Sequence, residues 1–242
     1  MSSSESTEAY IRFLKSISEA QYPLEYENLS EKYNIISLGV TNIYDDAKIV
    51  FLCGFNKPLN EWGLSDQGEK INSVSIVAKL FYKGVKVLLS WDAVGRHKDD
   101  TNHNTLIATE KYLVENAGAL FKSDILIAPH HGGNNGSSIA FINKVKPNVI
   151  IFSASHQYNH PTQNAADRYL LTVDIDNIFR TDRGDDEREA DKVYYEWSYS
   201  RIDGCTDLEG DDDVEIVIDG NRKYKVRYVS ENGRCKEHRN HF

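Results

Sequence analysis

Short runs in which apolar and polar residues alternate recur along this chain, and stretches with helical spacing of apolar positions lie between them. The alternating runs predict strands at residues 34–40, 47–55, 72–82, 85–90, 124–129 and 148–153. Helical spacing predicts helices at residues 6–20, 104–116, 138–144 and 163–171. Strands that alternate with helices are typical of layered α/β proteins, in which functional loops gather where the strands end.

The chain beyond Thr181 has a different pattern. Residues 192–200 and 214–229 have strand-like alternation and follow a charged turn. The sequence Asp219-Gly220-Asn221 is typical of a tight turn between strands. We therefore expect antiparallel strands that hinge at this turn.

Length and charge limit the functions that the chain can have. Its 242 residues, 40% of them hydrophobic, are enough for one large domain with its own core. No linker interrupts the pattern, so we expect a single domain over residues 1–230 and a polar tail over 231–242. The net charge of −9 argues against a general electrostatic affinity for nucleic acid or anionic membranes.

Cysteine usage and hydropathy indicate the compartment. The three cysteines have neither the number nor the spacing of a disulfide framework, which favours a reducing environment. No apolar stretch approaches the length of a membrane span, and the first residues are polar and acidic. We expect a cytoplasmic protein with no membrane partner.

The most informative run is Ile-Leu-Ile-Ala-Pro-His-His-Gly-Gly at residues 125–133, where an apolar strand ends in His130 and His131. Neutral imidazole is the commonest transition-metal ligand, so a metal is the expected partner of this pair. On an extended backbone the two side chains would point to opposite sides. One would then bind the metal, and the other would orient a ligand or bind from the turn. The alternative is a buried histidine with a satisfied hydrogen bond.

Two further polar residues follow predicted strands. Asp92 comes after the strand at 85–90, where a carboxylate can bridge metals or, alternatively, cap a turn. His160 ends the loop after the strand at 148–153, and Pro161 restrains its backbone. The other histidines lie in polar surroundings and are expected to be solvated: His97, His103, His156, His238 and His241.

The order of these motifs resembles the metallo-β-lactamase fold, and more narrowly the subgroup appended to ComEC-type DNA-uptake proteins. The resemblance covers about residues 47–229. It rests on Asn72-Ser-Val-Ser-Ile, Ser90-Trp-Asp92, Ala128-Pro-His-His-Gly-Gly133, His160-Pro161 and Phe179-Arg-Thr-Asp182. The resemblance implies an αββα sandwich, usually with a pair of zinc ions, and hydrolysis by a metal-bound hydroxide.

Carried onto this sequence, the resemblance implies that Asp92 bridges the two metals. His130 and His131 match the family's late histidine motif, and His160 matches a histidine near the substrate. The implied metal ligands are therefore Asp92, His130, His131 and His160, and the implied catalytic residues are Asp92, His131 and His160. Two departures are visible: Trp91 replaces a glycine and is expected to crowd the metal site, and Gly133 stands where serine is frequent.

The upstream metal motif of that family, His-x-His-x-Asp-His, is missing, because no histidine precedes His97. The chain therefore resembles the C-terminal part of such an enzyme, with the sandwich incomplete at its N-terminal half. Asp92, one of the tandem histidines and His160 could furnish one metal site but not the usual pair.

Three hypotheses follow from the sequence. The chain is one part of a split or truncated hydrolase with a phosphodiester or nucleic-acid substrate, completed by a chain that supplies the missing motif. Alternatively, it is a non-catalytic binding or regulatory module. Thirdly, it is an unrelated α/β protein. A missing sandwich half would leave an apolar sheet face uncovered, which predicts poor solubility or self-association.

Overall fold

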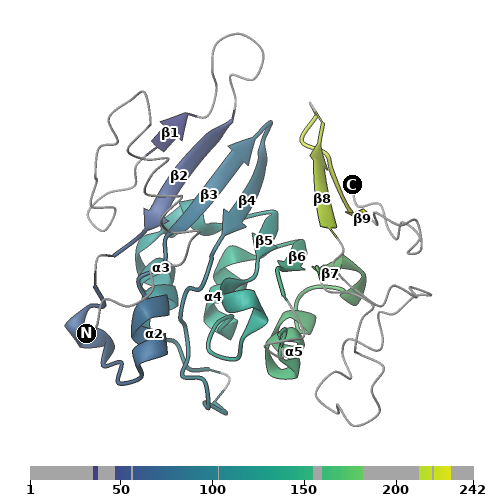
Figure 1. The fold of residues 1–242 in the computed structure, drawn as a ribbon. Coiled ribbons are helices and arrows are strands. Elements are labelled where there is room, and N and C mark those ends of the chain that lie inside the picture. The colour runs from purple at the N-terminus through teal and green to yellow at the C-terminus, as the bar shows by residue number, and fades with distance from the viewer. Residues whose placement is uncertain are drawn as a thin grey trace, which may run out of the picture.

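A seven-stranded sheet and a separate two-stranded hairpin form the framework of the molecule (Figure 1). The strands of the sheet lie side by side in the order in which they occur along the chain. The predicted α/β class is thus confirmed at the level of a mixed sheet with helices and a hairpin. The computed structural model describes residues 35–37, 47–55, 57–102, 104–154, 160–181, 213–219 and 221–229.

The first part of the sheet is antiparallel. It consists of β1 (Ile35–Ser37), β2 (Lys48–Cys53), β3 (Val77–Tyr82) and β4 (Val85–Leu89). β3 and β4 form a hairpin whose turn residues, Lys83 and Gly84, both have positive φ. This is the tight turn that the sequence predicts, and it sends β4 toward the second part of the sheet.

The second part of the sheet is parallel, and β4 is the strand that joins it to the first. β4 pairs with β5 (Ile125–Ile127), β5 with β6 (Val149–Phe152), and β6 with β7 (Ile178–Arg180). Helical segments connect these strands: α3 (Ala108–Asn116), η2 (Gly118–Phe121), η3 (Pro129–Gly132), α4 (Ile139–Val145), α5 (Gln163–Leu170) and η5 (Ile175–Asn177). The carboxyl ends of β4, β5 and β6 therefore meet at one edge of the sheet.

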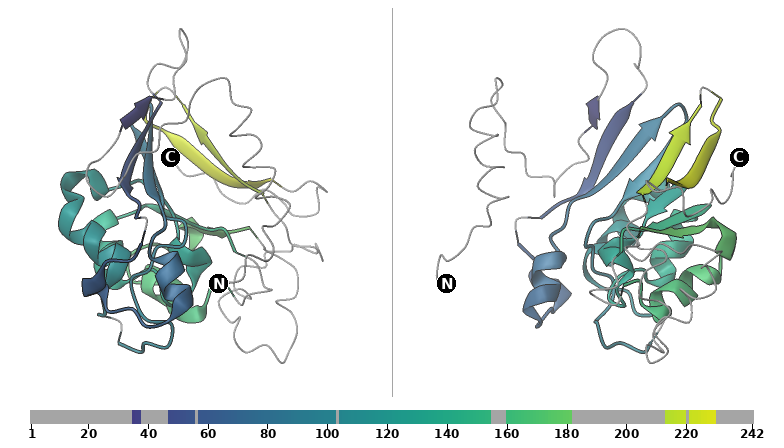
Figure 2. Two further views of the ribbon diagram at one scale, coloured as in Figure 1. Left: turned by 60° about the vertical axis from the view of Figure 1, so that its left-hand side comes forward. Right: turned by 45° about the vertical axis from the view of Figure 1, so that its right-hand side comes forward.

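One face of the sheet is covered by α3, α4 and α5, and we call it the helix-covered face (Figures 1 and 2). Alternate residues of the parallel strands point into this layer because side chains in a strand alternate between faces. The core residues include, from the sheet and the helices, Leu88, Leu126, Ile150, Leu113, Phe141 and Tyr169, all of them fully buried.

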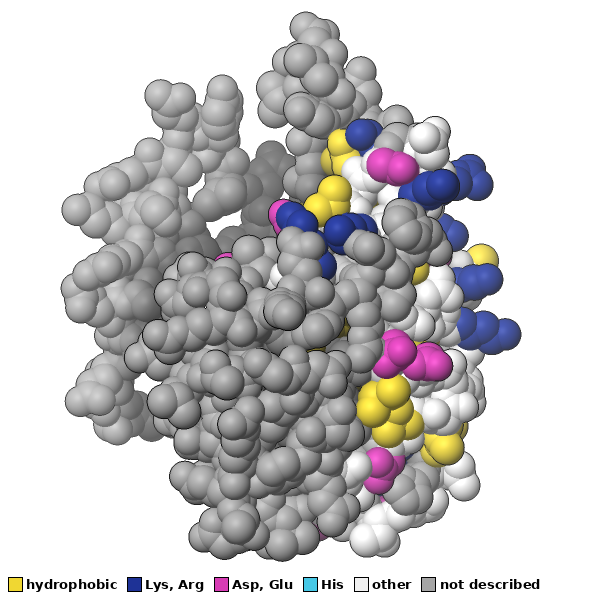
Figure 3. Space-filling view, turned by 90° about the vertical axis from the view of Figure 1, so that its right-hand side faces the viewer, with side chains coloured by type: hydrophobic (Ala, Val, Ile, Leu, Met, Phe, Trp, Pro, Cys, Tyr) yellow, Lys and Arg dark blue, Asp and Glu magenta, His cyan; other side chains and the backbone are white. Residues whose placement is uncertain are grey.

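The β8 (Asp213–Ile218) and β9 (Tyr224–Val229) hairpin packs on the other face, the hairpin-covered face. Val226 and Tyr228 contact the strand residues that alternate with the helix-facing ones. Val87 and Phe179 are among them. In the side view of Figure 3, Lys and Arg side chains gather along one edge of the molecule. No described histidine is visible in this view. The hairpin confirms the antiparallel strands expected around Asp219-Gly220-Asn221.

Two predicted boundaries are wrong. The strand expected at 72–82 begins at Val77, because α2 (Gln67–Asn72) and a turn occupy the residues before it. Asp66 caps this helix by accepting from the N–H of Glu69. The helix expected at 104–116 begins at Ala108, because the N–H of Ile107 donates to Gly95 instead of continuing a helical ladder.

Several other predictions have mixed outcomes. The sequence missed the short strand β7 and the one-turn helix η1 (Asn60–Trp62). The helix predicted at 6–20, the strand at 192–200 and the tail at 231–242 lie outside the described residues. Among the described residues, no helix is long and apolar enough to cross a membrane.

Candidate functional site

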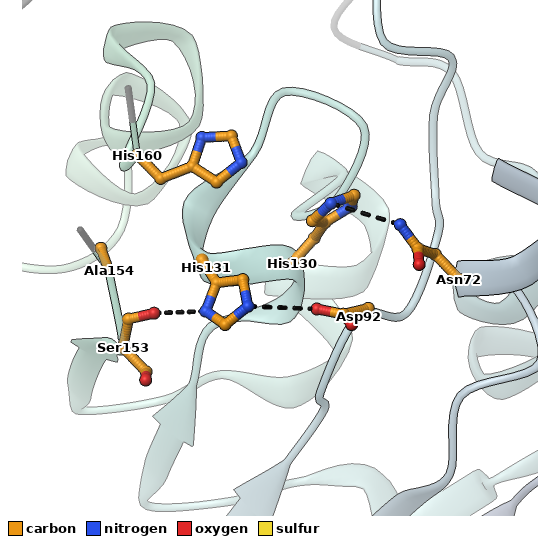
Figure 4. A pocket seen from close by; sticks show the side chains of 7 residues that line it. All are labelled: Asn72, Asp92, His130, His131, Ser153, Ala154 and His160. Atoms are coloured by element: carbon orange, nitrogen blue, oxygen red, sulfur yellow. Dashed lines mark hydrogen bonds and ion pairs between the residues drawn. The ribbon is translucent and has the colours of Figure 1, made fainter. Parts of the chain in front are cut away.

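A pocket of about 520 Å³ lies where β4, β5 and β6 end (Figure 4). Loops after these strands supply most of its walls, and the last residue of α2 closes one side. Its lining consists of Asn72, Asp92, His130, His131, Ser153, Ala154 and His160. The structure therefore brings together all of the residues that the sequence singled out as metal-binding or catalytic.

His130 and His131 both have left-handed backbone angles, with φ of 50° and 55°. The prediction of an extended backbone that sends the two side chains to opposite sides is wrong, since both rings line the same pocket. The physical reason is a tight turn: the N–H of His130 donates to Trp91 at 2.7 Å, and that of Gly133 donates to His130 at 2.6 Å. Left-handed angles at adjacent non-glycine residues are costly and occur most often at functional sites.

Gly132 allows this turn to pack tightly. Its φ is +83°, and a Cβ at this position would lie 2.6 Å from carbon atoms of both Phe152 and Pro161. The carbonyl of Gly132 accepts from the N–H and the hydroxyl of Thr162 at 3.0 and 3.1 Å. The loop that follows β6 is thereby tied to the tandem histidines.

The His131 ring is held from both sides. Its Nδ1 donates to the carbonyl of Ser153, and its Nε2 lies 3.4 Å from Oδ1 of Asp92 (Figure 4). Because a carbonyl only accepts, Nδ1 carries the proton, and Nε2 faces the carboxylate. A metal ion placed between these two atoms would interact favourably with both of them. Both side chains are about half exposed, so the pair is open to a ligand.

His130 lies deeper in the wall. Its Nε2 is 3.3 Å from the amide nitrogen of Asn72, and its Nδ1 is buried without a well-directed hydrogen bond from a described residue. Burial lowers the pKa of His130 below its ordinary value, as do the nearby His160 and His131 rings, while Asp92 and the amide of Asn135 act in the opposite direction. A neutral imidazole at this position is available as a hydrogen-bonding or metal-binding group.

His160 faces the tandem histidines from the loop after β6. Its ring centroid lies 5.8 Å from that of His130 and 6.5 Å from that of His131, and it stacks on the latter ring with an interplanar angle of 21°. A Cβ on Gly133 would lie 3.2 Å from Nε2 of His160. The departure from serine to glycine at 133 thus leaves more room beside this ring.

The loop that follows the histidines is braced by a buried carboxylate. Glu110 of α3 accepts from the N–H groups of Ser137 and Ser138 at 2.6 and 2.8 Å. A Cβ on Gly95 would lie only 1.9 Å from Oε2 of Glu110, so no larger residue fits there without displacing the carboxylate. Burial raises the pKa of Glu110, and hydrogen bonds from the two serines and the charge of Arg168 oppose this shift.

Two buried arginines also donate hydrogen bonds to this loop, and one of them links it to residues 100–102. Arg168 of α5 donates to the carbonyls of Ser137 and Gly136 at 2.7 and 2.9 Å. Arg96 donates to Asn102 and Asp100 at 2.7 Å each and to Asn134 at 3.3 Å. Three of these hydrogen bonds, to the carbonyls of Asn134, Gly136 and Ser137, restrain the loop after the histidines, so the pocket wall is preorganised.

The end of α2 is also anchored to the loops around the pocket. Glu69 is buried and accepts from the Nδ1 of His97 and the N–H of Lys98, both at 3.0 Å. His97 was expected to be a solvated surface residue; it is half exposed but has a defined partner. This contact fixes the helix that presents Asn72.

The donor set fits a metal ion only in part. Ligand atoms of a tetrahedral zinc lie about 3.3 Å apart, which follows from bond lengths near 2.0 Å and matches the separation between His131 and Asp92. The Ser153 carbonyl also fixes the His131 tautomer in the way that metal-binding histidines require. However, no group of three or more His, Cys, Asp or Glu side chains within the described ranges is arranged to hold a metal. These residues supply one edge of a metal site rather than a complete one.

Sequence reasoning missed two contributors and misjudged a third. Asn72 opens one of the motifs quoted above, and Ser153 ends a predicted strand, so each had a positional signal. Trp91 was expected to crowd the metal site, yet its side chain is 53% exposed and does not line the pocket. The bracing role of Glu110 had no such signal, because it depends on contacts distant in sequence.

Comparison with known proteins finds a partial similarity. The chain is 32% identical over 95 residues to Competence protein ComA from Neisseria gonorrhoeae. The match covers 35% of this chain and only 14% of the length of ComA. No protein-family model matches the chain. These comparisons support a distant relation to a competence protein over part of the sequence.

Proposed function

We propose that this chain carries part of a metal-dependent phosphodiester hydrolase site of the metallo-β-lactamase type, closest to the ComEC-type subgroup. One observation carries the proposal: Asp92 and His131 face each other across 3.4 Å at the carboxyl ends of parallel strands, with the far side of the His131 ring fixed by Ser153. The partial similarity to a competence protein supports the same subgroup.

The architecture is compatible with this proposal. A mixed sheet with helices on one face resembles one layer pair of an αββα sandwich, and the β8–β9 hairpin covers part of the opposite face. In open α/β sheets, ligands bind at the carboxyl ends of strands, where the pocket lies. The proposed fold is therefore a sandwich of the metallo-β-lactamase type whose second half is not among the described residues.

Each pocket residue has a proposed task. Asp92 and His131 supply two donors for zinc, and His130 and Asn72 orient a substrate oxygen or a further ligand from the buried wall. His160 faces the substrate from the loop after β6. When bound, zinc would polarise the scissile phosphate and lower the pKa of a nucleophilic water.

The remaining donors must come from outside the described residues. A chain that carries a His-x-His-x-Asp-His motif is the proposed source, with self-association of this chain as the simplest alternative assembly. Two-metal hydrolysis needs more donors than Asp92, His130, His131 and His160 supply. The active enzyme is therefore proposed to be an assembly.

Zinc binding and hydrolysis test the proposal together. We expect the purified chain to bind zinc weakly and to hydrolyse bis(p-nitrophenyl) phosphate only after a protein with the missing motif is added. His131→Ala and Asp92→Asn should each lower zinc affinity by about tenfold or more and abolish the activity. Asp99→Asn is the matched control for Asp92→Asn, because Asp99 is exposed and lies outside the pocket. Equal zinc affinity in His131→Ala would refute the assignment.

One observation favours a second candidate, a binding or regulatory module without catalysis. Within the described ranges, three metal donors do not come together. This candidate predicts less than one zinc ion per chain and no hydrolysis with any added partner. Binding of a phosphodiester ligand in the pocket should nevertheless persist and should weaken in His131→Ala.

A further inference from the structure

We infer that Trp91 is a stacking platform for a nucleobase, and that it selects single-stranded nucleic acid as the ligand whose backbone enters the neighbouring pocket. The inference rests on the proposed function and adds to it a residue that determines specificity. It concerns a side chain outside the pocket lining.

The first support is the turn in which Trp91 lies. The N–H of Ala93 donates to the carbonyl of Ser90 at 3.1 Å, so Trp91 and Asp92 are the central residues of a β-turn. Trp91 has a φ of 41°, and a turn with positive φ at its first central residue normally carries glycine there. Tryptophan is strained at this position, where glycine would be free of strain.

The second support is exposure. Tryptophan is among the most buried residue types on average, yet the side chain of Trp91 is 53% exposed. About half of the surface of this large side chain therefore stays in contact with solvent, and its burial compensates only in part for the strained backbone. Packing alone does not explain an exposed aromatic face on a strained backbone, and contact with a ligand does.

The third support is the position of Trp91 relative to the pocket. Its carbonyl accepts from the N–H of His130 at 2.7 Å, and the next residue, Asp92, lines the pocket. The backbone of Trp91 is thus fixed between two pocket residues. On α2, the exposed Ile71 likewise precedes the pocket residue Asn72 directly, which adds apolar surface beside the site.

The chemistry of the ligand follows from these contacts. A pocket lined by histidines suits a phosphate, and an exposed indole suits a flat, uncharged ring, so a nucleotide unit satisfies both. The net charge of −9 makes general attraction to a polyanion unfavourable, and stacking supplies affinity that does not depend on charge. A stacked base must be unpaired, which favours a single strand over a duplex.

The test measures binding of the full chain to a fluorescent hexathymidylate and to an abasic oligomer of the same length, by anisotropy and without hydrolysis. Stacking predicts that wild type binds the thymidylate at least about fivefold more tightly than the abasic oligomer. Trp91→Gly should remove this preference, leave the affinity for the abasic oligomer unchanged, and raise the melting temperature because the strain is relieved.

Trp91→Phe and Trp91→Leu form a second pair, since both keep a large side chain on the strained backbone and only the first keeps an aromatic face. Stacking predicts a preference for thymidylate in Trp91→Phe and none in Trp91→Leu. Equal binding of the two oligomers by wild type, or an unchanged preference in Trp91→Gly, would overturn the inference. Failure of the proposed function differs from this result, because it appears as missing zinc-dependent hydrolysis while the preference for bases persists.

Discussion

The helix-covered face and the hairpin-covered face bury similar strands but different chemistry. On the helix-covered face, Lys79, Glu110 and Arg168 are almost fully buried among apolar side chains. On the hairpin-covered face the buried cluster is apolar or aromatic, with Val226 and Phe179 at its centre. The charged groups of the first face end in hydrogen bonds to loop backbone: Glu110 and Arg168 hold the loop after the tandem histidines.

This difference reflects the separate roles of the helix layer and of the β8–β9 hairpin. Burying a charge is unfavourable unless it is paired and hydrogen-bonded. A layer that only excludes water from the sheet therefore needs no buried charges. The helix-covered face retains charges because its helices must also hold backbone that has left-handed angles at His130, His131 and Ser137. The hairpin only needs to fill the opposite face.

Removing the Glu110 carboxylate should have the largest effect on stability. Glu110→Ala leaves the N–H groups of Ser137 and Ser138 without an acceptor and Arg168 without its nearby carboxylate, so it should destabilise the protein by about 3–5 kcal/mol. Urea denaturation measures the loss. Glu115→Ala, at an exposed position of the same helix, is the control and should change stability by less than about 0.5 kcal/mol. A loss below about 1 kcal/mol in Glu110→Ala would show that the brace is unimportant.

Truncation in the hairpin should have a smaller effect that spares the pocket. Val226→Ala removes fully buried methyl groups and should cost about 1–3 kcal/mol of unfolding free energy. Zinc affinity measured well below the melting temperature should stay unchanged, because no hydrogen bond to the pocket loops comes from this residue. Lys225→Ala, which changes the opposite side of the same strand, serves as control. Loss of zinc affinity in Val226→Ala would mean that the two faces are coupled.

The smallest expected effect is the pH dependence of stability that the buried amine of Lys79 causes on the helix-covered face. Burial lowers the pKa of Lys79 from 10.5 to about 8, although its Nζ donates to the carbonyls of Leu120 and Lys122. Between these two values the unfolded chain binds more protons, so stability contributed by Lys79 rises with pH and is lost as pH falls from 10.5 toward 8.

Comparison with Lys79→Met isolates this contribution from other groups that titrate in alkali. The unfolding free energy of wild type, measured relative to that of Lys79→Met, should rise by about 1 kcal/mol from pH 8 to pH 9. The same difference should be flat between pH 6 and pH 7. A constant difference across the whole range would mean that the folded protein holds Lys79 with its ordinary pKa.

Sequence patterns predicted the pocket residues better than the contacts that hold the pocket loops in place. Asp92, His130, His131 and His160 could be identified because each follows a predicted strand, and the ends of parallel strands meet at one edge. The left-handed turn at the histidines could not, because it depends on a hydrogen bond from the N–H of His130 to the carbonyl of Trp91 and on tight packing of Gly132 against Phe152.

The boundaries of the helices and strands were likewise harder to predict than their presence. Alternation at 72–82 resembles a strand throughout, but Asp66 lies upstream and caps a helix that ends at Asn72. The capping residue overrides the pattern of the residues that follow it, because it stabilises the first turn of the helix. This is also why Asn72 reaches the pocket from a helix rather than from a strand.

The split of the sheet into antiparallel and parallel parts has a consequence for folding kinetics. The β3–β4 hairpin closes a turn of Lys83 and Gly84, whereas the next pairings join Val87 to Ile125 and Ile125 to Val149. Local pairings form early and distant ones form late. Since the pocket loops leave β4, β5 and β6, we expect the pocket to be complete only after the folding barrier has been crossed. A ligand in the pocket should then slow unfolding and leave the rate of folding unchanged.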